Sequence, residues 1–195
     1  MSVLSKQEIK RRLELTTDKP ESIVITPLLS EEFDHDSVDV RLGSYFRLPA
    51  ISSVRCIEPY RVTPETIISQ YPELVHKPYG GSESELIVQP HHSILASTLE
   101  YIKMPGDVSG EVLTKSSWAR VFISIASAPW IHPFYRGCLT LEVANLGNVP
   151  VALPVGKPIA HLVFMKLEGQ EEIKSDIIEG SYAGAIMPEA PIFRG

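Results

Sequence analysis

The sequence predicts an all-β protein, a sandwich or barrel of short strands preceded by one N-terminal helix. Short β-type runs recur along most of the chain, and turn residues separate them, including 16 prolines and 12 glycines among 195 residues. Apolar residues alternate along several runs, as in Val38–Val40–Leu42 and Ile159–His161–Val163–Met165. Closely spaced alternating strands are typical of sandwiches and barrels rather than of βαβ units. The chain length suits one domain, so we expect a single domain over residues 1–195.

The helix is expected within residues 1–20, over 5-SKQEIKRRLEL-15. Ser5 is placed to cap its start, and Glu8 follows three residues later, which is the spacing of a capping box. Ile9, Leu13 and Leu15 give this segment a partial apolar face. The helical pattern largely ends there.

Strand-type runs fill most of the remaining chain, and 145-NLGN-148 predicts a tight turn between two strands of one hairpin. Residues 58–85 interrupt the strands, with a helical turn expected at 65–71, and we interpret them as a loop inserted over the β-core. The tail, residues 168–195, lacks periodicity and is expected either to be disordered or to lie across another surface. The expected strands are 22–29, 37–48, 85–90, 93–104, 110–115, 121–128, 138–145, 149–153 and 158–167.

Composition excludes several classes of protein. The net charge of −6 argues against general nucleic-acid binding, which leaves a basic footprint. No apolar run approaches the roughly 20 residues that span a bilayer, and the charged N-terminus lacks a signal core, so we expect a cytoplasmic protein without membrane contacts. Cys56 and Cys138 are then expected to be reduced thiols. The His-x-Glu and Pro-Cys-x-x-Cys pattern of zinc-dependent nucleobase deaminases is missing from the sequence.

The segment 115-KSSWAR-120 places two hydroxyls between two cations. Serine hydroxyls and backbone N–H groups donate to phosphate oxygens, and lysine or arginine balances the charge. If Ser116 opens a helical turn over 117–122, the N–H groups at its start also point at the anion. The alternative is that Ser116 only caps a turn and the cations are solvated.

Glu142 stands alone in the strand-like run 139-LTLEVAN-145. A carboxylate on the less apolar face of a strand usually faces solvent, but a partly buried one can shuttle protons. Strand alternation places Leu139, Leu141 and Val143 on one face and Thr140, Glu142 and Ala144 on the other.

Asp39, in 37-SVDVRLG-43, is a third polar position inside an apolar run. We expect it either to pair with Arg41 or to cap the turn at Gly43. Both expectations give it a structural role.

Several of these segments together resemble the dCTP deaminase family of the dUTPase superfamily. They are 37-SVDVRLGSYFR-47, 115-KSSWAR-120, 131-IHPFYRGCLTLEVAN-145 and 149-VPVALPVGKPIAHLVF-164. They occur in the family's order, and 105-PGD-107 precedes the Ser-Ser motif. The resemblance extends to about residue 167.

The resemblance implies a distorted jelly-roll β-barrel that forms homotrimers with active sites between subunits. It implies a deoxynucleoside triphosphate ligand, dCTP or also dUTP or dTTP, with Mg²⁺ on its phosphates and no zinc. Glu142 would activate water for attack on C4 of cytosine, giving dUTP and ammonia in pyrimidine deoxynucleotide metabolism. The residues that would contact the substrate are Lys115, Ser116, Ser117, Arg120, Ala128, His132, Thr140, Leu141 and Tyr182.

Three positions depart from the family pattern. Lys115 replaces an arginine, His132 replaces an aspartate that lies at the deoxyribose, and the tail keeps only Tyr182 of a segment that closes over the phosphates as a lid. Lysine lacks the bidentate fork, and neutral histidine is not an anionic acceptor. Two alternatives therefore stay open: a dUTP diphosphatase or bifunctional enzyme, and a nucleotide-binding homologue without catalysis.

Overall fold

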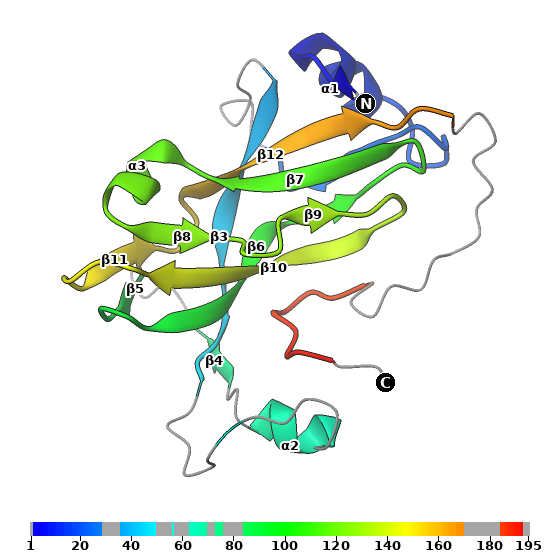
Figure 1. Cartoon of the computed structure of the whole chain (residues 1–195). Coiled ribbons are helices and arrows are strands. Elements are labelled where there is room, and N and C mark those ends of the chain that lie inside the picture. Colours follow the sequence, from blue (N-terminus) through cyan, green and yellow to red (C-terminus); the bar gives the residue numbers. More distant parts are fainter. Residues whose placement is uncertain are drawn as a thin grey trace.

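The computed structural model describes residues 2–28, 36–49, 56, 63–69, 73–75, 84–169 and 184–192, and strands dominate them (Figure 1). The predicted all-β class is confirmed. The helices are α1 (Lys6–Leu13), α2 (Pro64–Ser69) and α3 (Ser116–Arg120). The strands are β1 (Ser2–Val3), β2 (Val24–Thr26), β3 (Ser37–Arg47), β4 (Glu73–Val75), β5 (Glu85–Val88), β6 (Ser93–Lys103), β7 (Val108–Thr114), β8 (Ile123–Ile125), β9 (Trp130–Ile131), β10 (Arg136–Asn145), β11 (Val151–Pro154) and β12 (Pro158–Lys166).

One large antiparallel sheet runs in the order β8-β10-β6-β3-β12-β7-β9 and curls into a half-barrel. The curl is centred on β3, whose first half pairs with β12 and whose second half pairs with β6. Gly43 lies where β3 changes partners, and a Cβ there would lie 2.8 Å from the Ser97 carbonyl oxygen. Glycine is required here because the two backbones approach too closely for any side chain.

The hydrophobic core fills the inside of this curl. The predicted series Val38, Val40 and Leu42 is fully buried there. Along β12 the inward face is Ala160, Leu162 and Phe164, whereas His161, Val163 and Met165 are half-buried on the other face. Both faces of β12 are largely apolar, so alternation alone does not identify the inner one.

Helix α1 begins as predicted, because the Ser5 hydroxyl accepts from the Glu8 N–H. Its Arg12 is 3% exposed and donates to both carboxylate oxygens of Asp107, at 2.9 and 2.8 Å, and Lys166 also donates to that carboxylate. Burial by itself raises the pKa of Asp107, but the hydrogen bonds from Arg12 and Lys166 outweigh it and leave that pKa lowered. This charge cluster, which we call the Asp107 brace, fixes the helix to the sheet.

The turn after β10 forms, but the predicted hairpin is wrong. β11 pairs with β5 in a separate two-stranded sheet, whereas β10 pairs with β6 and β8. The fully buried Asn145 explains the redirection. Its amide donates to Val88 O at 2.9 Å and Val149 O at 2.8 Å, and its oxygen accepts from the Gly147 N–H. These bonds direct the chain after β10 towards β5, so that β11 pairs with β5.

The described part of the 58–85 interruption contains α2, which confirms the expected helical turn, and β4, which pairs with β3. Cys56 and Cys138 are both free thiols, as predicted. No helix in the described ranges is both long enough and apolar enough to cross a bilayer.

Candidate active site

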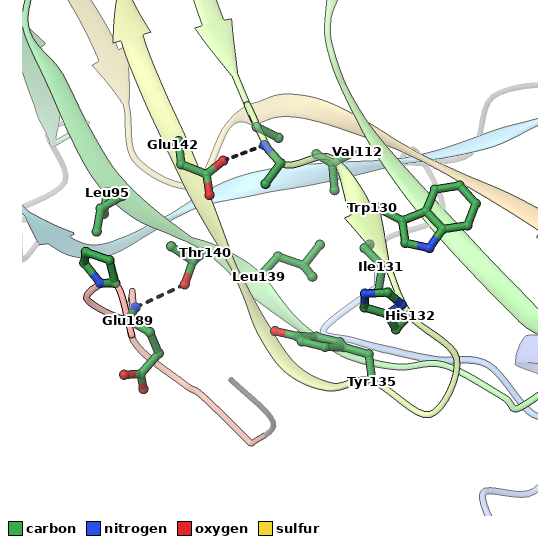
Figure 2. A pocket seen from close by; sticks show the side chains of 13 residues that line it. Leu95, Val112, Trp130, Ile131, His132, Tyr135, Leu139, Thr140, Glu142 and Glu189 are labelled. Atoms are coloured by element: carbon green, nitrogen blue, oxygen red, sulfur yellow. Dashed lines mark hydrogen bonds between the residues drawn. The ribbon is translucent and has the colours of Figure 1, made fainter. Parts of the chain in front are cut away.

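A pocket of about 650 Å³ opens beside β10 (Figure 2). Its walls come mainly from β10, from the segment that joins β8 to β10 and from the C-terminal segment, and β6 and β7 contribute one residue each. The lining residues are Leu95, Val112, Ala126, Ala128, Trp130, Ile131, His132, Tyr135, Leu139, Thr140, Glu142, Glu189 and Pro191.

The alternation of β10 explains which of its side chains reach this pocket. Leu141 and Val143 are fully buried in the core, and half-buried Thr140 and Glu142 line the pocket. This confirms the two predicted faces from Thr140 onward. Leu139, which was expected to share the face of Leu141, instead lines the pocket, because the register of β10 shifts between Cys138 and Thr140. The alternation also places the Leu141 side chain away from the pocket lining.

Glu142 is fixed at one end of the pocket by the chain that follows β8. Its Oε2 accepts from the Ala128 N–H at 3.2 Å, and its backbone carbonyl accepts from the Ala126 N–H at 3.2 Å (Figure 2). The carboxylate therefore has a defined orientation inside the pocket. One oxygen is held by a backbone donor, which leaves lone pairs of the other for a ligand.

The opposite wall is aromatic and comes from β9 and the turn after it. Trp130 and His132 lie close together there, and β9 is held by its pairing with β7 (Figure 2). Tyr135 forms the adjoining side, and its hydroxyl donates to the Cys138 carbonyl at 2.8 Å. Burial raises the pKa of Tyr135 well above its usual value, so this phenol stays protonated.

The charges of the pocket are unusual for a site that would take a whole nucleotide. Its lining includes two carboxylates, Glu142 and Glu189, and no lysine or arginine from the described part of the chain. A triphosphate needs cations to balance it. The pocket thus suits an uncharged ring that offers hydrogen-bond donors, and phosphates would have to lie elsewhere.

The cations and hydroxyls lie on α3 and at its N-cap, Lys115, in a separate region (Figure 1). Ser116, Ser117 and Arg120 are exposed, and none of them lines the pocket. The predicted helical turn is confirmed, and it begins at Ser116. The alternative that Ser116 caps the turn is wrong, because Lys115 occupies the N-cap without a side-chain capping bond.

Lys115 is already neutralised within its own chain. It donates to Asp39, whose other oxygen lies 2.9 Å from Nδ1 of His161. The expected pairing of Asp39 with Arg41 is wrong, because the Arg41 Nε donates to the buried Glu100 at 2.6 Å. The contact of His161 with Asp39 could not be predicted from the sequence, since nothing in the pattern of β12 marks this side chain as facing Asp39.

The C-terminal segment 184–192 lies across β10, which fulfils the second of the two expectations for the tail. It contributes Glu189 and Pro191 to the pocket. Tyr182, the remaining predicted contact of the tail, lies outside the described residues.

A family model described as dCTP deaminase-like matches residues 3–167 of this chain. The chain belongs to the dCTP deaminase-like family. The curated "dCTP deaminase, dUMP-forming" of Methanobrevibacter smithii is 34% identical over 175 residues, covering 89% of this chain and 84% of that protein. The "dCTP deaminase" of Natronomonas pharaonis is 33% identical over 197 residues, covering 99% and 95%.

The fold is shared with a solved structure as well. A crystal structure of 2'-deoxycytidine 5'-triphosphate deaminase from Agrobacterium tumefaciens matches with a TM-score of 0.60 at 18% identity. That match covers 85% of this chain and 48% of the other, so the chain spans about half the length of that protein.

Within this family member, the predicted site residues fall into two groups. Ala128, His132, Thr140 and Glu142 are brought together in the pocket. Lys115, Ser116, Ser117 and Arg120 are brought together at α3, outside it. Among the pocket residues that the sequence did not indicate are Trp130, Tyr135 and Glu189.

Proposed function

We propose that this protein is a dCTP deaminase that converts dCTP and water to dUTP and ammonia. The observation that carries the proposal is the position of Glu142, a carboxylate held by the Ala128 N–H inside an otherwise largely apolar pocket. Curated relatives that carry the name dCTP deaminase support the substrate class.

Glu142 would work as general base and then as general acid. It takes a proton from water as the oxygen forms a bond to C4 of cytosine, and it passes a proton to N4 as the C4–N4 bond breaks and ammonia leaves. The Ala128 N–H holds one oxygen of the carboxylate, and neighbouring apolar walls exclude competing water. The base itself would lie against Trp130 or His132, because aromatic faces stack on flat rings.

The triphosphate would be held by α3 of a second copy, in a homotrimer with sites between subunits. Two observations support this. The exposed hydroxyls and cation of α3 do not line the pocket of their own chain. Phe122 and Leu146 are 64% and 65% exposed, and they are adjacent, since the Leu146 N–H donates to the Phe122 carbonyl. They form an exposed apolar surface beside α3 of the kind that a second copy would bury.

Mg²⁺ would enter the site already bound to the phosphates of the substrate. The described residues contain no group of three or more His, Cys, Asp or Glu that could hold a metal ion. The donor set of the pocket therefore does not fit zinc, and the proposed reaction passes through no protein-bound metal.

The second candidate is formation of dUMP, favoured by the name of the relative from Methanobrevibacter smithii. Cleavage of the triphosphate needs a group that activates a second water. His132, which replaces an aspartate of the family pattern, lies in the pocket. An aspartate could accept a proton from this second water as an anion, and neutral imidazole is not an equivalent acceptor. We therefore propose dUTP, rather than dUMP, as the main product.

The test is to incubate the protein with dCTP and Mg²⁺ and to follow ammonia, dUTP, dUMP and pyrophosphate together. Ammonia with dUTP supports the first candidate, and ammonia with dUMP and pyrophosphate supports the second. Binding of dCTP without ammonia at high protein concentration would leave only a nucleotide-binding role.

Sharing of sites between copies has its own test. Glu142→Gln and Arg120→Ala are refolded together at equal amounts and assayed below the KM for dCTP. If each site takes Glu142 from one copy and Arg120 from the next, about a quarter of the sites in random closed oligomers are intact. Activity that stays at the level of the separate variants would place both residues in one chain's site.

A further inference from the structure

We propose that His161 is a positioning residue for Lys115: the two side chains share Asp39, and a proton on the imidazole releases the lysine to the phosphates of the substrate. This cluster of Asp39, Lys115 and His161 lies at the start of α3 and outside the pocket. The identity of the ligand, a nucleoside triphosphate, rests on the proposed function. The sharing of Asp39 is a property of the chain itself.

The three side chains come from neighbouring parts of one sheet, in which β12 lies between β3 and β7. Asp39 on β3 and His161 on β12 are direct cross-strand partners, so the register of the sheet fixes their contact. Lys115 follows the last residue of β7, which pairs with the other edge of β12. The lysine therefore approaches Asp39 from the far side of β12.

The hydrogen bond to Asp39 determines which nitrogen of His161 can take up a proton. An ionised carboxylate only accepts, so the Nδ1 that lies 2.9 Å from the Asp39 oxygen must carry a hydrogen. In the neutral ring Nε2 is then the basic nitrogen, and no described residue bonds to it. The side chain is 26% exposed, so solvent can protonate it there. Protonation at Nε2 keeps the bond to Asp39 and makes it charge-assisted.

The balance of charges shows what this proton does to Lys115. When His161 is neutral, Lys115 faces the whole negative charge of Asp39 and forms an ion pair with it. When His161 is protonated, the same carboxylate is already balanced, so most of the attraction that holds the lysine is lost. Lys115 is partly exposed and adjoins the Ser-Ser pair, where an anion can replace Asp39 as its partner. Protonation of His161 therefore increases the positive charge that α3 offers to phosphates.

The other charged groups on the elements around His161 do not replace Asp39. On β3, Arg41 donates to a buried carboxylate of β6. On β7, Glu111 lies two positions along from the residue opposite His161. On α3, Arg120 is exposed and directed to the first turn of its own helix. Within the described part of the chain, Asp39 is the one side chain that bonds to His161.

Binding of dCTP with Mg²⁺ at two pH values tests the proposal. His161→Gln is the informative variant, because its amide can still donate to Asp39 but takes up no proton. Calorimetry in a Glu142→Gln background avoids consumption of the substrate. The added His161→Gln change should leave the Kd unaltered at about pH 8, where imidazole is neutral. At about pH 6, where imidazole is mostly protonated, it should raise the Kd by about threefold to tenfold.

The matched control is His92→Gln, an exposed histidine in the turn between β5 and β6. It should leave the Kd unaltered at both pH values. Protonation of the substrate phosphates affects all the proteins equally, so it cancels when the variants are compared at one pH.

Lys115→Ala separates release of the lysine from a simple gain of positive charge. If His161 acts through Lys115, Lys115→Ala should raise the Kd by about threefold or less at about pH 8 and by about tenfold at about pH 6. Adding His161→Gln to Lys115→Ala should then have little further effect at the lower pH, since the two residues act as one unit. An undiminished effect of His161→Gln in the absence of Lys115 would overturn the positioning role.

The binding experiment also separates this inference from the proposed function. Absence of dCTP binding at both pH values would overturn the proposed function together with the inference. Binding with the same Kd for His161→Gln and its background protein at about pH 6 would overturn the inference alone.

Discussion

The pocket beside β10 and the surface of α3 divide the predicted site into two chemically opposite regions. The pocket is apolar, partly enclosed and lined by two carboxylates with no described lysine or arginine. The α3 surface is exposed and carries hydroxyls and Arg120. Under the proposed function, proton transfer and phosphate binding would belong to these separate regions, so variants in the two regions should affect different kinetic constants.

The largest effect is expected in the pocket. Glu142→Gln keeps the shape of the side chain but removes the proton acceptor, so kcat for ammonia release should fall by about 10³-fold with little change in KM. Glu85→Gln, at an exposed position on β5, is the matched control and should retain wild-type kcat. Normal turnover by Glu142→Gln would show that the proton passes through another group.

The second effect concerns stability and lies outside both regions. Asp107→Asn removes the carboxylate that both Arg12 and Lys166 contact and leaves buried Arg12 with Glu8 as its remaining acidic partner, so it should lower the free energy of unfolding by about 3 kcal/mol at pH 7. The folded pKa of Asp107 is lowered, so this contribution is present above the unfolded pKa and is lost as pH falls through the folded pKa. Urea unfolding should therefore show wild type and variant converging below about pH 4. A difference that persists at low pH would contradict the charge explanation.

The smallest effects separate the two cations of the α3 region. Arg120→Ala should raise the KM for dCTP by about 10-fold to 100-fold, the loss of a hydrogen bond to a charged group. Lys115→Ala should raise it by about threefold or less, because Asp39 already balances that charge. Steady-state measurement of the KM for dCTP in both variants shows which cation contributes more to binding. A larger effect at Lys115 would mean that it leaves Asp39 to bind phosphate.

Much of the fold could be predicted because it follows from local rules. The N-cap at Ser5, the alternation of β3 and the alternation of β10 from Thr140 onward each depend on neighbouring residues. The hairpin prediction failed because the buried Asn145 side chain bonds to Val88, far away in sequence. No local pattern contains such a contact.

The candidate site also contains residues that local sequence patterns reveal and residues whose roles depend on distant contacts. Glu142 and α3 stand out in sequence because a carboxylate in an apolar run and a Ser-Ser pair between cations are locally unusual. Asp39 was assigned the wrong partner, since its neighbour Arg41 is drawn to Glu100 on β6. Glu189 could not be found, because its place depends on how a segment without periodicity crosses β10.

The way in which the first residues are anchored has a consequence for biosynthesis. β1 pairs with Met165 and Lys166 of β12, and Arg12 of α1 reaches Asp107. Residues 2–12 therefore precede nearly all of the barrel in the chain and must wait for its later strands before they find their partners. Contacts so distant in sequence slow folding. Until β12 emerges, the amphipathic α1 stays exposed as a surface on which chaperones can act.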